Sequence, residues 1–215
     1  MNKKEIFDDI ANYYDSWFET PLGKKIYQSE RKAIENLIEN GENKLAVDLG
    51  IGTGLFTEIL REKGYKVIGI DISEEMLKIA RRRGFEVIKR DLNEPLPFQD
   101  ESIDFVFSMT SIEFLKDPKN LFDEVKRVLK KDGKFLLITL NSISLWALRR
   151  RLRGFFKKDD FFNKAKFYSP FSLKKFFKDG WEILNIKSAT FIPPWNPIFP
   201  SFWEKFISKI FPICG

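Results

Sequence analysis

The chain has 215 residues, of which 43% are hydrophobic and 32% charged, and its formal net charge is +6. This length and apolar content suit one globular domain, while the single cysteine and the lack of histidine exclude a disulfide framework and an obvious zinc or haem site. The positive charge allows an acidic partner, but the many Lys and Glu residues favour the mixed-charge surface of a thermophile.

The N-terminal region, residues 1–40, shows two amphipathic helical patterns, which we expect to form a helical lid. Its first ten residues, MNKKEIFDDI, contain acids and no long apolar run, so they do not form a secretory signal. No stretch approaches the roughly 18 apolar residues of a membrane span. We therefore expect a cytoplasmic protein without a transmembrane segment.

The central region, residues 41–141, alternates strand and helix patterns. Apolar, β-branched runs predict strands at 44–50, 65–71, 85–91, 102–110 and 134–141. Helical spacing predicts helices over 55–64, from a Ser73 cap to Gly84, and from Asp117 to a turn at Gly133. Such connections predict an α/β fold with a doubly wound, mostly parallel sheet, helices on both faces, and ligands at the carboxyl edge.

The C-terminal region has two parts, which we assign to the same single domain, residues 1–215. Residues 142–168 are basic and aromatic and are predicted to be an insertion. Residues 169–215 are predicted to contain a helix near 172–179, a sixth strand over 181–191 and a helix over 201–211.

Three glycines follow the first predicted strand as G-x-G-x-G: Gly50, Gly52 and Gly54. Glycine permits positive φ and lets a backbone approach a ligand closely. The dinucleotide fingerprint G-x-G-x-x-G fails here, because Leu55 stands where its third glycine belongs, and no P-loop lysine follows. Asp48 would repel a pyrophosphate, so it indicates a ligand with an ammonium or sulfonium group.

Acids also follow the next two strands. Asp71, 21 residues after Gly50, ends the second strand, where a carboxylate can accept both hydroxyls of a ribose. Asp91 and Leu92 follow the third strand, where a polar group can meet an exocyclic amine and an apolar neighbour can cover a base. These loops together favour an adenosine with a cationic amino-acid arm.

With these motifs the chain resembles the class I S-adenosylmethionine-dependent methyltransferases, in their small-molecule branch. The resemblance rests on VDLGIGTG, GIDIS, RDLNEPLPF and SIDFVFSM, in order, and covers roughly residues 10 to 191. It implies a Rossmann-like fold, S-adenosylmethionine as cofactor, a small-molecule methyl acceptor and no metal. It also implies a set of cofactor-binding residues: Asp48, Gly50, Gly52, Gly54, Asp71, Ile72, Asp91, Leu92, Ser108, Met109, Tyr14 and Trp17.

Two candidate roles stay open at this stage. Tyr14 and Trp17 belong to the motif YYDSWF and are expected to close over the methionine end of the cofactor, although Tyr14 equally suits core packing. Glu113 stands where many relatives have histidine after the fourth strand, and it is the candidate catalytic residue for orienting an amine or accepting a proton. The alternative is a solvent-facing acid, and no base is obligatory for an activated methyl group.

Two other functions are considered. A nucleic-acid methyltransferase would use the basic segment 149–158, but the chain lacks an NPPY-like tetrapeptide after the fourth strand. A non-catalytic cofactor-binding protein is the second alternative. The family's sheet also has a seventh, antiparallel strand between strands five and six. No such strand follows residues 181–191, so we expect it to be missing and the chain to be truncated relative to its relatives.

Overall fold

The computed structural model describes residues 3–144, 147, 165–177 and 180–187. The elements alternate in chain order as the sequence predicts. They are α1 (Lys3–Glu19), α2 (Pro21–Glu35), β1 (Leu45–Leu49), α3 (Glu58–Glu62), β2 (Lys66–Asp71), α4 (Glu74–Arg82), β3 (Glu86–Lys89), β4 (Ile103–Met109), the 3-10 helix η1 (Ile112–Phe114), α5 (Pro118–Val128), β5 (Leu129–Ile138) and α7 (Pro170–Leu173).

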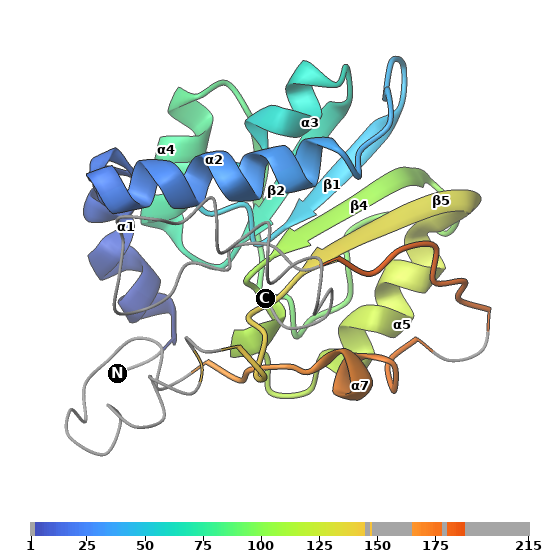
Figure 1. Ribbon diagram of the computed structural model, residues 1–215. Helices are drawn as coiled ribbons and strands as arrows, with labels where there is room; N and C mark the ends of the chain where they lie inside the picture. The colour runs from blue at the N-terminus through green and yellow to red at the C-terminus, as the bar shows by residue number, and fades with distance from the viewer. Residues whose placement is uncertain (1–2, 145–146, 148–164, 178–179, 188–215) are drawn as a thin grey trace.

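One parallel sheet organises the described part of the chain, with strand order β3-β2-β1-β4-β5 (Figure 1). All four pairings are parallel, and β1 lies between β2 and β4. The chain order reverses direction across the sheet at β1 and β4, so their carboxyl ends mark the switch point where ligands bind in such folds. The predicted doubly wound architecture is therefore confirmed.

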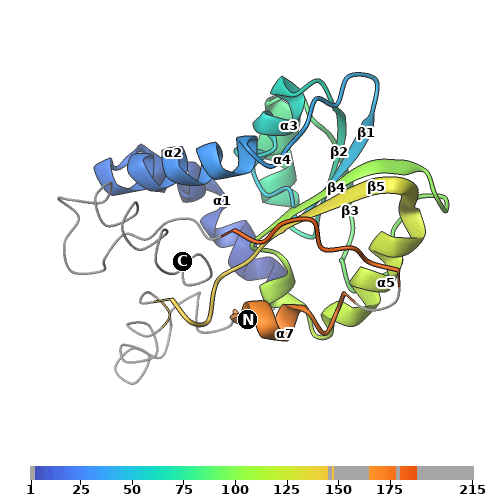
Figure 2. The same cartoon turned by 45° about the vertical axis from the view of Figure 1, so that its right-hand side comes forward.

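Helices cover both faces of this sheet. Alternate residues of β1 and β4 point to opposite sides: Ala46 and Phe105 pack with α2 and α3, whereas Val47 and Val106 pack with α5. Figures 1 and 2 show α2, α3 and α4 together on one side and α5 with α7 on the other. This alternation gives the sheet two apolar layers and leaves its carboxyl edge to polar loops.

Most helices begin where the sequence provides a cap. The Ser73 hydroxyl accepts a hydrogen bond from the Met76 N–H at the start of α4, as predicted. Thr20 caps α2 and Asp117 caps α5, and in both helices proline occupies the first turn. The predicted turn at Gly133 takes a different form, because the β4–β5 register passes from Leu129 to Lys134 and β5 already begins at Leu129.

The prediction of a sixth strand over 181–191 is wrong for its described part. Residues 180–187 form no strand, although they run beside β5 (Figures 1 and 2) and Trp181 contacts Phe135 at a ring-centroid distance of 6.0 Å. Ile183, Leu184 and Ile186 are exposed by 44 to 67%. β propensity alone does not form a strand when no neighbouring strand pairs with it. The helix predicted near 172–179 is instead the short α7, Pro170–Leu173.

Several predictions fall partly or wholly on other residues. Residues 145–146, 148–164 and 188–215 lie outside the described part of the chain. They include most of the insertion, its basic segment 149–158, the helix over 201–211 and the place of a seventh strand. Among the described residues, no helix is long and apolar enough to cross a membrane.

Candidate functional site

The glycine turn after β1 starts the site. The N–H groups of Gly50 and Ile51 donate to the Ile70 carbonyl at 2.8 and 3.0 Å, which folds the chain sharply at the carboxyl edge. All three glycines have positive φ: +84° at Gly50, +54° at Gly52 and +81° at Gly54. A Cβ atom added at Gly52 would meet nothing within 4 Å, so this turn borders open space. A ligand can therefore lie directly against its backbone.

Asp71 lies at the end of β2, beside that space. Its Oδ2 accepts a hydrogen bond from the Gly52 N–H and its Oδ1 one from the Ser73 N–H, both at 2.9 Å. Burial raises the pKa of Asp71, and the hydrogen bonds from Ser73 and Gly52 oppose that rise. Ile72, between Asp71 and Ser73, is half-buried. The carboxylate is thus held in place by two loops, with lone pairs left for further donors.

Asp48 is the buried acid of β1. It is 2% exposed, and its Oδ2 accepts a hydrogen bond from the Thr57 hydroxyl at 2.5 Å. Burial raises its pKa to about 7, the Thr57 hydrogen bond lowers it, and the nearby charge of Asp71 raises it further. Near neutral pH this carboxyl group is therefore poised to ionise when a cation approaches.

The loop after β3 places its two predicted residues differently. Asp91 is half-buried, and its Oδ1 accepts hydrogen bonds from both the backbone N–H and the side-chain amide of Asn93. Leu92 is 9% exposed and belongs to the apolar cluster on the α5 side. The loop thus offers one polar side chain, while Leu92 also contributes to the core.

The end of β4 closes the site from the other side. Ser108 is fully buried, and its hydroxyl donates to the Leu49 carbonyl at 3.0 Å, whereas Met109 is half-buried. Thr110 then takes φ of +53°, an uncommon value for a β-branched residue. This turn brings Ser111 Oγ to 2.0 Å from the position that a Cβ on Gly50 would take. No sequence signal indicated that Thr110 would be strained in this way.

Glu113, in η1, is completely buried rather than exposed to solvent. Its Oε1 accepts a hydrogen bond from the Leu140 N–H at 2.7 Å, and its Oε2 has no hydrogen-bond partner among the described residues. Burial raises its pKa to about 7, against the Leu140 hydrogen bond. The side chain therefore joins η1 to the segment that follows β5.

Helix α1 carries Tyr14 and Trp17. Both side chains are partly exposed, by 36 and 45%. Burial of the Tyr14 hydroxyl raises its pKa, and the negative charges of Glu30, Asp15, Asp71 and Asp48 add to the rise. The negative charges of Asp48 and Asp71 thus act on this hydroxyl from the ends of β1 and β2. Trp17 packs edge-on against Phe18 at 4.9 Å.

Two acids of α1, Asp8 and Asp15, contact the loops of the site, and the sequence did not single them out. Asp8 reaches Ser73 after β2, and Asp15 reaches Thr53 within the glycine turn. The only signal in the sequence is their spacing of seven, which places them on one face of a helix.

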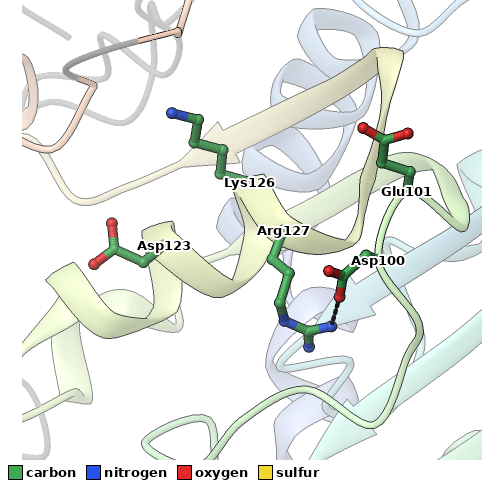
Figure 3. Close-up of a pocket in the computed structure, with 5 residues that line it drawn as sticks. All are labelled: Asp100, Glu101, Asp123, Lys126 and Arg127. Carbon is green, nitrogen blue, oxygen red and sulfur yellow. Dashed lines mark hydrogen bonds and ion pairs between the residues drawn. The ribbon is translucent and has the colours of Figure 1, made fainter.

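A hollow of about 620 Å³ lies elsewhere, near the amino ends of the strands (Figure 3). Charged side chains line it: Asp100, Glu101, Asp123, Lys126 and Arg127. Figure 3 shows Arg127 directed at Asp100, with which it forms an ion pair at 2.7 Å. Because this hollow contains no glycine turn and lies away from the switch point, the carboxyl edge is the better candidate site. The described residues contain no group of three acids or cysteines arranged to hold a metal.

Comparison with known proteins gives a family profile and several relatives. The profile described as "Methyltransferase domain" matches residues 47–137. A crystal structure from Thermotoga maritima, described as a SAM-dependent methyltransferase and possible histamine N-methyltransferase, superposes with a TM-score of 0.70 at 30% identity, over 86% of this chain and 91% of that one.

Two sequence relatives extend the comparison. The uncharacterized protein MJ1123 of Methanocaldococcus jannaschii is 36% identical over 185 residues, which are 86% of this chain and 83% of that protein. The biotin biosynthesis bifunctional protein BioHC of Teredinibacter turnerae is 31% identical over 206 residues, which are 86% of this chain but 34% of that protein.

Proposed function

Because this chain belongs to the S-adenosylmethionine-dependent methyltransferases, we propose that it transfers the cofactor's methyl group to a small-molecule acceptor. The family uses S-adenosylmethionine, and the chain is an enzyme of this class. Two relatives favour a small acceptor, since one is described as a possible histamine N-methyltransferase and another is named for biotin biosynthesis.

The observation that carries this proposal is the open space at Gly52 beside the fixed carboxylate of Asp71. A ligand that fills this space meets the glycine backbone on one side and a hydrogen-bond acceptor on the other. Asp71 is the proposed ribose ligand, and Asp91 with Leu92 the proposed adenine contact. The remaining proposed cofactor residues surround the same edge: Asp48, Gly50, Gly54, Ile72, Ser108, Met109, Tyr14 and Trp17.

The protein's part in the chemistry is placement and charge. The cofactor's sulfonium supplies an already activated methyl group, so the enzyme needs to hold an acceptor in line and to exclude water. Asp48 contributes a buried carboxyl group whose ionised form a neighbouring cation stabilises. Ser108 is fully buried and supports the end of β4 through its hydrogen bond to Leu49, while Met109 is half-buried and packs against the apolar cluster on the α2 and α3 side.

For Glu113 we propose a positioning role on the acceptor side rather than contact with the acceptor. Its side chain is fully buried and holds the Leu140 N–H, and its backbone carbonyl accepts the Lys166 N–H at 2.8 Å. One residue thereby fixes both flanks of the segment between β5 and α7. A catalytic role would need Glu113 to be exposed to the acceptor, and the side chain has no exposed surface.

The test is a methyl-transfer screen with labelled S-adenosylmethionine, in which histamine and other small amines, phenols, carboxylic acids and RNA are separate arms. Product in a small-molecule arm that disappears in Asp71→Ala supports the proposal. Product in the RNA arm alone would favour the nucleic-acid alternative. Cofactor binding that is insensitive to Asp71→Ala would refute the proposed cofactor site.

A further inference from the structure

Helix α1 lies across the carboxyl ends of the strands (Figures 1 and 2). It touches three segments at this edge along its length, two of which are loops of the proposed cofactor site. Near its start, Phe7 packs edge-on against Phe114 of η1 at a ring-centroid distance of 5.0 Å. Further along, Asp8 and Asp15 contact the loops that follow β2 and β1. The helix therefore covers the edge at which the cofactor would bind.

The first acidic contact supports the proposed ribose ligand. Asp8 Oδ1 accepts hydrogen bonds from the Ser73 hydroxyl at 2.6 Å and from the Glu75 N–H at 3.3 Å. Ser73 is completely buried, and its own N–H donates to Asp71. Asp8 is thus connected to the Asp71 carboxylate through one shared residue.

The second acidic contact lies within the glycine turn. Asp15 Oδ1 accepts a hydrogen bond from the Thr53 hydroxyl at 2.7 Å, and Oδ2 forms an ion pair with Arg83 at 2.5 Å. Thr53 is 1% exposed and stands between Gly52 and Gly54. Asp15 therefore ties α1 both to the turn and to the end of α4.

These contacts belong together because Asp8 and Asp15 are seven residues apart, two turns along one face of α1. Hydrogen bonds to ionised carboxylates are stronger than neutral ones, and both partner hydroxyls are shielded from water. Tyr14 lies between the two acids in sequence, and the charges of Asp48 and Asp71 act on its hydroxyl. The two acids therefore tie one face of α1 to the loops that follow β2 and β1.

We propose that Asp8 and Asp15 hold α1 closed over the cofactor loops before binding, and that the cofactor enters and leaves when both acids release their partners. This inference rests on the proposed cofactor site. It makes Asp8 and Asp15 positioning residues that act through Ser73 and Thr53. Under this proposal the same contacts form with and without cofactor, so they set the rates of binding more than the affinity.

The test is stopped-flow binding of S-adenosylhomocysteine to Asp8→Ala and Asp15→Ala. Each variant is expected to raise both the association and the dissociation rate constants by about tenfold, as for the loss of one charge-assisted hydrogen bond. The dissociation constant should change by less than about threefold, since the two rates move together. Asp9→Ala, an exposed acid on the same helix, is the matched control and should match the wild type.

Unchanged rates in both variants, or a faster dissociation with unchanged association, would overturn the inference. Amide hydrogen exchange supplies an independent readout: exchange in α1 should accelerate in the two variants while β1 stays protected, and equal protection of α1 would also overturn it. The underlying site is judged separately by Asp71→Ala. If Asp71→Ala binds as the wild type does, the proposed cofactor site is wrong. If Asp71→Ala binds weakly while Asp8→Ala and Asp15→Ala keep wild-type rate constants, only the proposed role of Asp8 and Asp15 is wrong.

Discussion

The two halves of the carboxyl edge are built in different ways. On the cofactor side, the glycine turn and Asp71 belong to consecutive elements, and the Gly52 N–H meets Asp71 only 19 residues away. On the proposed acceptor side, Glu113 meets Leu140 from 27 residues away and Lys166 from farther still. The glycine turn and Asp71 therefore come from consecutive elements, whereas Glu113 fixes a segment that returns from farther along the chain, and we expect each half to be perturbed separately.

The largest effect is expected from Gly52→Val, on the proposed cofactor side. The side chain would fill the open space of the turn and a β-branched residue resists φ of +54°, so we expect cofactor affinity to fall by at least about 100-fold. Calorimetric titration with S-adenosylhomocysteine measures the loss. Gly84→Ala is the matched control, because Gly84 also has positive φ, +87°, but lies outside the site. Equal binding by both variants would contradict a ligand at Gly52.

Asp71→Ala also acts on the proposed cofactor side, but it removes a charged carboxylate instead of filling open space. The loss of two hydrogen bonds to a carboxylate should cost about 1.5–3 kcal/mol of binding free energy. The same calorimetry measures it, with the exposed Asp132→Ala near the amino edge as a charge-matched control. Acceptor-side residues should be unaffected, so a change in Leu140 amide exchange in Asp71→Ala would argue against two separable halves.

Glu113→Gln tests the proposed acceptor side through the pH dependence of the free energy of unfolding. Burial raises the Glu113 pKa from 4.5 to about 7. Between these two pH values the folded state keeps a proton on Glu113 that the unfolded state has lost. The stabilisation is complete below the unfolded pKa and is lost as pH rises through the folded one. Between pH 5 and 7 the wild type should lose about 2 kcal/mol that Glu113→Gln does not lose, while Asp48 continues to contribute in both.

Urea unfolding at the two pH values measures this difference. Cofactor affinity in Glu113→Gln should equal that of the wild type, because Glu113 contacts the segment after β5 and not the glycine turn. An identical pH dependence in the two proteins would show that Glu113 is ionised when folded.

Tyr14→Phe is the smallest expected change. It removes a single hydroxyl near Asp48 and Asp71, so cofactor affinity should fall by about threefold, typical of one neutral hydrogen bond. Tyr13→Phe is the neighbouring control, since Tyr13 is 74% exposed. If Tyr14→Phe binds more tightly, the hydroxyl competes with the cofactor for the two acids instead of assisting it.

The sequence predicted the features that depend on neighbouring residues. The positions of β1–β5 along the chain and the Ser73 cap follow from apolar runs and capping chemistry within a few residues, and the parallel direction of the strands follows from the helices between them. The positive φ values of the glycine turn also follow from residue type.

The wrong strand prediction and the contacts that were not predicted both depend on residues far away in the sequence. Residues 181–187 have the composition of a strand but lack the pairing that would make them one. Asp8 meets Ser73 across 65 residues and Asp15 meets Thr53 across 38, distances at which no local pattern carries information. The burial of Glu113 likewise depends on where the chain returns after β5.

The three glycines of the turn have different occupants in the space that their missing side chains leave. At Gly50 that space holds the Ser111 hydroxyl, and at Gly54 it holds the ring of Phe85, whereas at Gly52 it is open. Selection for the fold alone would therefore preserve Gly50 and Gly54 in any descendant, whether or not it still binds a ligand. A homologue that has lost its catalytic role should diverge first at the middle glycine, for example to asparagine, which tolerates the same φ. In a family alignment, we therefore expect position 52 to distinguish active enzymes from relatives that keep only the fold.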